Sequence, residues 1–219
     1  MTESWPQLPE AAADFRYLLA RGYPRKNALT LVGNRYHLNR TARQLLHRGV
    51  FAPTVAAARR IKLRLLADLA GRPLAVDGHN VLITLECARR GLPLVAADDG
   101  FLRDVGEISR AFRLTATTHQ VLDLLAAFLA AQPVGALNFY YDAPLSLSGE
   151  LARHTQEILA AQGLKAQAAA VPVPERELLA FPGPIATSDT ALIEAHDEVV
   201  DLAGEIIRQQ GWPRLELGD

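Results

Sequence analysis

Short apolar runs alternate with longer amphipathic segments through the C-terminal two thirds of this 219-residue chain. The short runs predict buried strands, which we place at 73–77, 93–97, 136–142, 166–171 and 184–187. The segments between them carry apolar residues at helical spacing, so we expect helices at 80–90, 118–131, 149–162 and 190–209. Strands and helices in alternation predict a mostly parallel sheet that is covered on both faces.

The first third of the chain has a helical pattern throughout. Apolar residues at helical spacing, bounded by Gly, Pro and Asn, predict four helices at 11–20, 24–33, 39–49 and 54–69. Pro73 follows the last of them and opens the first strand. We therefore expect two domains, a small all-helical one at 1–72 and an α/β one at 73–219.

The formal net charge of −1 conceals a split between these two parts. Residues 1–72 contain 13 Lys and Arg against 4 Asp and Glu, whereas residues 73–219 contain 10 against 20. Two explanations of this split are equally good. Either two faces of opposite charge dock against each other, or the basic part binds a polyanion while the acidic part binds cations. Four cations cluster on the predicted helix 54–69, as a solvated face or as a phosphate contact surface: Arg59, Arg60, Lys62 and Arg64.

Several classes of protein are disfavoured by composition. The single cysteine, Cys87, excludes a disulfide framework and a thiolate metal cluster. No apolar run approaches the roughly 20 residues needed to cross a membrane, and the N-terminus lacks a signal pattern. We expect a cytoplasmic protein without a membrane partner, and the sequence is compatible with a homo-oligomer.

Three of the predicted strands lead into an aspartate: Asp77, Asp142 and Asp189. The carboxyl ends of parallel strands meet at one edge of a sheet, where ligands bind in open α/β folds. Carboxylates that converge without histidine or cysteine favour a hard cation such as Mg²⁺ or Mn²⁺. Such an ion assists the hydrolysis of phosphodiesters. Each acid also has a structural alternative, because Asp77 and Asp142 can brace turns and Asp189 can stabilise the start of a helix.

Other polar residues near these positions have two interpretations as well. Asn80 can cap the helix that follows Asp77 or can order a ligand carboxylate or water. Ser188 can contact phosphate near a helix N-terminus, although ordinary capping is the simpler explanation. Asp99 and Asp104, in the long connection 98–117, can serve a loop turn or supply further metal ligands.

Three short motifs carry a resemblance: Asp77-Gly78-His79-Asn80, Tyr141-Asp142-Ala143 and Ala186-Thr187-Ser188-Asp189. In this order they resemble the signatures of PIN-like nucleases of the NYN branch. The whole chain also resembles an uncharacterised prokaryotic family that joins a basic helical domain to a PIN-like domain, through Arg21-Gly22-Tyr23-Pro24 and Val32-Gly33-Asn34-Arg35-Tyr36.

The resemblance implies a three-layer α/β/α PIN-like domain and a Mg²⁺- or Mn²⁺-dependent ribonuclease. It implies Asp77, Asp142 and Asp189 as metal ligands with Asn80 and Ser188 in support, and RNA held by the basic N-terminal helices. Many PIN-like sites carry four acids, and no position matches the fourth clearly, so Asp99 or Asp104 is expected to substitute.

Two alternatives to this hypothesis follow from the same residues. One is a catalytically inactive PIN-like module that binds RNA or associates with ribosomes. The other is a phosphatase of the haloacid dehalogenase type, which also places an aspartate after a strand. That chemistry needs a second carboxylate two residues later, where this chain has His79, so we rank it lower.

Overall fold

The computed structural model describes residues 5–105 and 114–218, and these residues confirm the α/β class. A sheet of six parallel strands has the order β1-β8-β7-β2-β5-β6. Its strands, in that order, are Leu63–Arg64, Val199–Val200, Ile185–Ala186, Leu74–Asp77, Leu137–Asp142 and Ala166–Val171. The central position of β2 follows from its sequence, because Leu74, Ala75 and Val76 are buried on both faces of the sheet.

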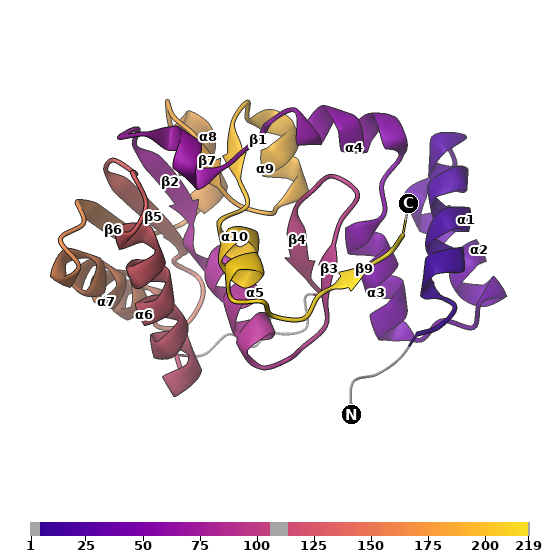
Figure 1. The fold of residues 1–219 in the computed structure, drawn as a ribbon, viewed down its shortest axis with the longest axis horizontal. Helices are drawn as coiled ribbons and strands as arrows, with labels where there is room; N and C mark the ends of the chain where they lie inside the picture. Colours follow the sequence, from indigo (N-terminus) through magenta and orange to yellow (C-terminus); the bar gives the residue numbers. More distant parts are fainter. Residues whose placement is uncertain (1–4, 106–113, 219) are drawn as a thin grey trace.

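Helices cover both faces of this sheet, which gives three layers (Figure 1). Leu74 and Val76 of β2 belong to the larger core, to which four helices contribute: α5 (Gly78–Arg89), α6 (Ala116–Ala130), α7 (Ser148–Ala161) and α10 (Leu202–Gln209). Ala75 faces the other way, into a smaller core with α8 (Pro174–Ala180) and α9 (Thr190–Ala195). Alternate residues of one strand thus supply both cores, as a covered parallel sheet requires.

The N-terminal helical region is confirmed, and it packs on a second, smaller sheet. Its helices are α1 (Leu8–Ala20), α2 (Arg25–Arg35), α3 (Arg40–Gly49) and α4 (Pro53–Arg60). The smaller sheet has the order β4-β3-β9, with strands Leu102–Asp104, Leu94–Ala96 and Leu215–Glu216. Figure 1 shows the C-terminal strand β9 beside these helices.

A shared core joins the helical region to the small sheet. Phe15 of α1 and Leu45 of α3 are buried in one cluster with Val95 of β3 and with Leu217, which follows β9. The contact at the end of α3 is so close that a Cβ on Gly49 would lie 2.5 Å from Cγ2 of Val95. The N-terminal helices therefore share a hydrophobic core with residues from the far end of the chain.

Two predicted helices are wrong in their extent. The helix expected at 54–69 ends at Arg60, after which β1 pairs with β8 and a 3₁₀ helix runs over Leu66–Leu69. The helix expected at 190–209 is divided by β8 into α9 and α10. In both places a two-residue strand extends the sheet, and pairing with distant residues outweighs the local helical spacing. The strands β4 and β9 and the helix α8 were not among the predicted elements.

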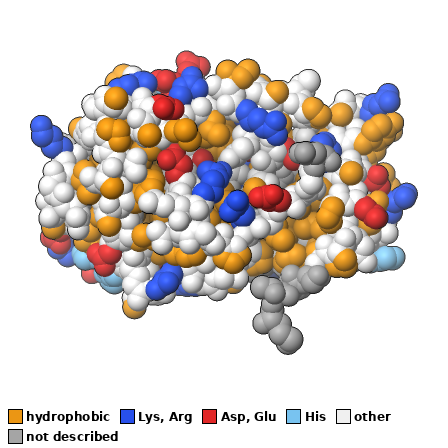
Figure 2. All heavy atoms as spheres, viewed as in Figure 1, with side chains coloured by type: hydrophobic (Ala, Val, Ile, Leu, Met, Phe, Trp, Pro, Cys, Tyr) orange, Lys and Arg blue, Asp and Glu red, His pale blue; other side chains and the backbone are white. Residues whose placement is uncertain are grey.

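The surface and the helix lengths bear on the remaining expectations. Within the part of the chain that the structure describes, no helix is long and apolar enough to cross a membrane. On the face shown in Figure 2, Lys and Arg side chains lie singly or in small groups among apolar and acidic ones. On this face, the excess positive charge of residues 1–72 is therefore distributed rather than gathered into one broad basic surface.

Candidate functional site

The aspartates at the strand ends are brought to one edge of the large sheet. Asp77 ends β2 and Asp142 ends β5, which is a direct neighbour of β2. Asp189 follows β7, the neighbour of β2 on its other side. All three line one cavity of about 380 Å³, which we call the acidic cavity. Its other polar lining residues are Arg48, His79, Asn80, Asp104 and Glu175.

Asp77 is the most deeply placed of these acids. Its side chain caps α5, because Oδ1 accepts a hydrogen bond from the backbone N–H of Asn80 at 3.3 Å. Its Oδ2 accepts a hydrogen bond from Oγ1 of Thr187 at 2.9 Å. Burial first, with smaller contributions from the negative charges of Asp142 and Asp189, raises the pKa of Asp77 to about 7, although these two hydrogen bonds lower it. The cavity therefore holds a carboxylate that is costly to ionise without a nearby cation.

Asn80 and Ser188 connect the helix after β2 to the loop after β7. Oδ1 of Asn80 accepts hydrogen bonds from the backbone N–H of Ser188 at 2.8 Å and from its hydroxyl at 3.0 Å. Asp77, rather than Asn80, is the N-cap of α5. Asn80 thus fixes the position of the segment that carries Asp189, and Ser188 is buried in that contact.

His79 positions the third acid, Asp142. Nδ1 of His79 accepts a hydrogen bond from the backbone N–H of Asp142 at 3.0 Å, so the proton of the neutral ring lies on Nε2. Oδ2 of Asp142 lies 3.3 Å from the same nitrogen. Burial lowers the pKa of His79, and the charge of Asp142 opposes that shift. A neutral, buried imidazole therefore holds the end of β5, while the Asp142 side chain is 38% exposed towards solvent.

Asp104 and Asp99, both candidates for a fourth acid, lie in different environments. Asp104 ends β4, is only 5% exposed, and lines the acidic cavity with Oδ2 at 3.4 Å from Oγ1 of Thr84. Asp99 lies outside this cavity, because its carboxylate is fully buried and is bound by Arg103 at 2.7 and 2.9 Å and by Arg59 at 3.0 Å. Of these two candidates, Asp104 therefore lines the acidic cavity and Asp99 does not.

The ligand atoms of the acidic cavity are of the type that a hard cation prefers, but they are too far apart to surround one ion. Four aspartates, Glu175 and the amide of Asn80 offer oxygen ligands of the kind that Mg²⁺ and Mn²⁺ prefer, while Nδ1 of His79 is occupied by the backbone N–H of Asp142. Among the described residues, however, no three His, Cys, Asp or Glu side chains are close enough together to hold an ion. The side chains of Asp142 and Asp189 are not buried, and Oδ1 of Asp189 caps α9 by accepting hydrogen bonds from the backbone N–H groups of Ala191 and Leu192. The donor set fits a divalent ion in its chemistry, and holding one would require these two carboxylates to turn towards Asp77.

A second cavity of about 590 Å³ adjoins the first, and sequence reasoning did not find it. We call it the arginine cavity, because its lining includes Arg25, Arg48, Arg59 and Arg103. It shares Arg48, Asn80 and Asp189 with the acidic cavity. The charge split of the sequence was the available signal, but residues from α2, α3, α4 and β4 converge here only in the folded chain.

Comparison with known proteins identifies the family. Residues 66–205 match the domain of unknown function DUF5616, and residues 7–62 match the protein of unknown function DUF434. An uncharacterized protein of Methanocaldococcus jannaschii, MJ0935, is 31% identical over 202 residues, which cover 91% of this chain and 96% of that protein. No solved structure matches the chain. Neither family description names an activity or a PIN or NYN domain. The DUF5616 match spans more than half of the residues of this chain, so the chain belongs to the DUF5616 family.

Proposed function

We propose that this protein is a divalent-metal-dependent ribonuclease of the PIN-like, NYN type, working in the cytoplasm at the acidic cavity. The observation that carries the proposal is the convergence of Asp77, Asp104, Asp142 and Asp189 on one cavity at the carboxyl edge of the sheet. Structural capping accounts for Asp77 and Asp189 one at a time. It gives no reason for these four carboxylates and Glu175 to share one space, where they repel one another.

The metal would be held by Asp77, Asp142 and Asp189, with Asp104 as a further carboxylate. A Mg²⁺ or Mn²⁺ ion held there would supply Lewis-acid chemistry: it would polarise a phosphoryl oxygen and lower the pKa of a water molecule so that the water could act as the nucleophile. The raised pKa of Asp77 supports the assignment, since a cation beside a buried carboxylate removes the cost of ionising it.

The other residues of the cavity orient its acids and the RNA. His79 holds the backbone of Asp142, and Asn80 holds the loop that carries Asp189, so both acids lie on well-defined backbone. Arg48 projects from the N-terminal helical region, with Nη1 4.0 Å from Oδ2 of Asp104. It can therefore contact a phosphate that enters the cavity, as part of the RNA contact that we assign to the basic N-terminal helices.

Cleavage of a mixed RNA pool in the presence of Mn²⁺ tests the proposal. Asp77→Asn keeps the shape of the side chain and removes one negative ligand, so cleavage should fall by about 100-fold or more. Asp189→Asn should behave in the same way. The matched control is Asp123→Asn, because Asp123 is exposed on α6 and is not among the lining residues of either cavity. Cleavage that is unchanged in Asp77→Asn would refute the assignment of the site.

A catalytically inactive RNA-binding module is the second candidate. The observation that favours it is the absence, among the described residues, of three acids that already surround one point. A wild-type protein that binds RNA, cleaves none of it, and gains no thermal stability from Mn²⁺ would identify this alternative. Thermal melts with and without Mn²⁺, on wild type and Asp77→Asn, separate the two functions.

A further inference from the structure

Three guanidinium groups surround the ring of Phe51 in the arginine cavity. The guanidinium carbons of Arg25, Arg59 and Arg103 lie 4.7, 4.4 and 5.2 Å from the ring centroid. Such contacts hold cations in place without neutralising them. The ring therefore keeps three positive charges together at the wall of a cavity.

Arg59 has a donor that its neighbours do not use. The residue is 6% exposed and gives Nη1 to Asp99 and Nη2 to Glu194. Its Nε is buried and has no hydrogen-bond partner among the described residues. A buried N–H without a partner is costly, so an acceptor supplied by a ligand in the cavity would stabilise this arrangement.

The cluster also has fewer buried negative charges than positive ones. Asp99 is the fully buried carboxylate between Arg59 and Arg103, while Glu194 is 60% exposed at its side chain. Arg25 donates to the carbonyl oxygens of His47 and Val50 and, within the described residues, forms no ion pair with a carboxylate. Burial lowers the pKa of Arg25 to about 10, with Arg59 and Arg103 acting in the same direction and with Asp99 and Asp98 opposing the shift. Three buried or half-buried cations thus share one fully buried anion.

We propose that the arginine cavity binds a phosphate monoester group, with Arg25 and Arg59 as its principal ligands. A monoester carries close to two negative charges at neutral pH. Arg25, which forms no ion pair within the described residues, and the unpartnered Nε of Arg59 are the cationic donors that remain for its oxygens. Arginine forks suit phosphate oxygens, and Nε of Arg59 supplies one donor of such a fork. The cavity volume of about 590 Å³ lies within the range of small-ligand sites and exceeds what one phosphate needs.

The position of the cavity indicates which substrate would carry this phosphate. Phe51, Val55 and Leu19 add an apolar wall, which suits a base or sugar next to the phosphate. Arg48, Asn80 and Asp189 belong to both cavities, so a strand whose terminal phosphate lies among the arginines continues towards the acids. This second step rests on the proposed function and makes the preferred substrate an RNA with a phosphorylated end. Phosphate binding itself does not depend on it.

Isothermal titration of the full chain in EDTA tests both steps, because the chelator prevents cleavage. The titrants are inorganic phosphate and three RNAs of one sequence, which carry a 5′-phosphate, a 3′-phosphate or only hydroxyl ends. We expect inorganic phosphate to bind, and one phosphorylated RNA to bind about 10-fold or more tightly than the hydroxyl RNA, as a bidentate charged contact provides. Equal binding of all three RNAs, together with phosphate binding, would identify the ligand as free phosphate.

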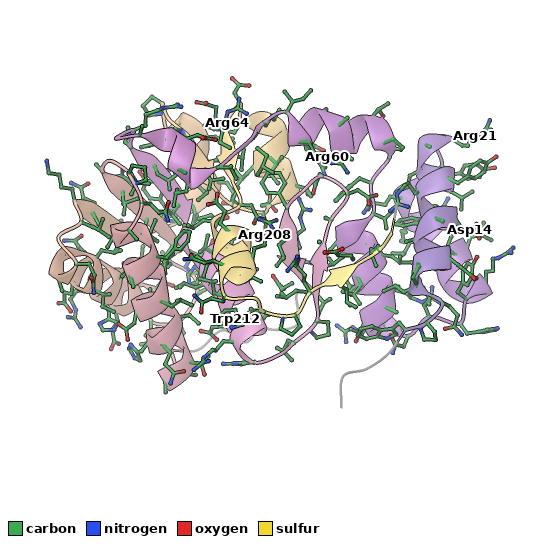
Figure 3. All side chains as sticks on the ribbon, viewed as in Figure 1. Asp14, Arg21, Arg60, Arg64, Arg208 and Trp212 are labelled. Carbon is green, nitrogen blue, oxygen red and sulfur yellow. The ribbon has the colours of Figure 1, made fainter. Side chains whose placement is uncertain are left out.

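Variants test where phosphate binds. They also show whether a negative result contradicts phosphate binding or the proposed nuclease activity. Arg25→Gln leaves no carboxylate without a partner, so the fold should persist, and phosphate binding should fall about 10-fold. Arg59→Lys keeps the charge but removes the Nε donor, and it should weaken binding similarly. The control Arg21→Gln changes an exposed arginine at the periphery of the helical region (Figure 3) and should have no effect.

Asp77→Asn provides the separating measurement, because it should abolish cleavage while leaving phosphate affinity unchanged. A protein that cleaves no RNA but binds phosphate through Arg25 would keep this inference and refute the nuclease. Two results overturn the inference itself. One is that millimolar inorganic phosphate gives no binding heat, and the other is that Arg25→Gln binds phosphate as well as the wild type does.

Discussion

The two adjoining cavities have opposite charge, and they differ in how far that charge is neutralised by neighbouring side chains. In the acidic cavity, carboxylates from β2, β4, β5 and the loop after β7 face one another, and the nearest cation is Arg48 at its border. In the arginine cavity, one buried carboxylate, Asp99, holds two of the arginines together. The first is a set of like charges with one cation, Arg48, at its border. The second is an ion cluster in which the central anion stabilises the fold.

Because of this difference, replacing an aspartate by asparagine should have opposite effects on stability in the two cavities. Removing a charge from the acidic cavity relieves repulsion, whereas removing the central charge of the arginine cavity leaves cations without a partner. Stability, and not only activity, can therefore distinguish a ligand-binding carboxylate from a structural one. Aspartate to asparagine is the suitable change, because it preserves size and alters only charge and hydrogen bonding.

The largest effect on stability is expected for Asp99→Asn. Arg59 and Arg103 would remain buried beside a neutral amide, and breaking a buried ion pair typically costs about 3 to 5 kcal/mol of unfolding free energy. Urea denaturation at pH 7 measures the change, with Asp197→Asn as a control, since Asp197 is exposed and outside the lining of both cavities. A loss below about 1 kcal/mol would show that Asp99 does not hold the cluster together.

Asp77→Asn should instead stabilise the metal-free protein at neutral pH, by about 2 to 4 kcal/mol. The pKa of Asp77 is about 7 in the fold against 3.8 ordinarily, and each unit corresponds to about 1.4 kcal/mol. Because the folded state binds this proton more tightly, ionisation of Asp77 progressively destabilises the wild type as pH rises from about 4 to 7.

Urea denaturation in EDTA at pH 4 and pH 8 checks both the sign and the window. The gain from Asp77→Asn should be small at pH 4, where the folded side chain is protonated and the unfolded one, with its pKa of 3.8, is only about half ionised, and it should be complete at pH 8. A variant that is less stable than the wild type at pH 8 would mean that the hydrogen bonds from Thr187 and Asn80 outweigh the cost of burial.

The positions of these two acids show what sequence reasoning reached. The strand before Asp77 and the strand before Asp142 were predicted from apolar runs, and parallel pairing then requires their ends to share an edge. The distinct environments of Asp99 and Asp104 could not be predicted. Asp99 meets Arg59 across 40 residues, and β4 is set by pairing with β3 rather than by a local pattern. The helix expected at 54–69 failed for the same reason, because β8 pairs with part of it.

Arg48→Gln should have moderate effects of opposite sign on Mn²⁺ affinity and on RNA affinity. Arg48 is partly exposed and lies at the border of both cavities, 4.0 Å from Asp104, so its charge competes with a metal ion and attracts phosphate. Its removal should raise Mn²⁺ affinity by about 3- to 10-fold and weaken RNA binding by a similar factor. The slope of RNA affinity against salt should also fall by about one phosphate contact. Arg48→Lys is the control and should retain most of both properties.

Glu198→Gln should have the smallest effect, and it serves as a reference outside both cavities. Glu198 pairs with Arg72 and with Arg64, which is labelled in Figure 3 near β1 at the edge of the large sheet. Arg72 first, and then Arg64, lower the pKa of Glu198 to about 2 against burial, which raises it. The side chain of Glu198 is 30% exposed at the surface, so screening by water and salt should limit the loss to less than about 1 kcal/mol. The stabilisation should be complete above about pH 4.5 and should disappear as pH falls to about 2. Thermal melts at pH 7 in low and high salt measure it, and a loss as large as that of Asp99→Asn would show that surface pairing, rather than the buried carboxylate, dominates the electrostatic stability of this fold.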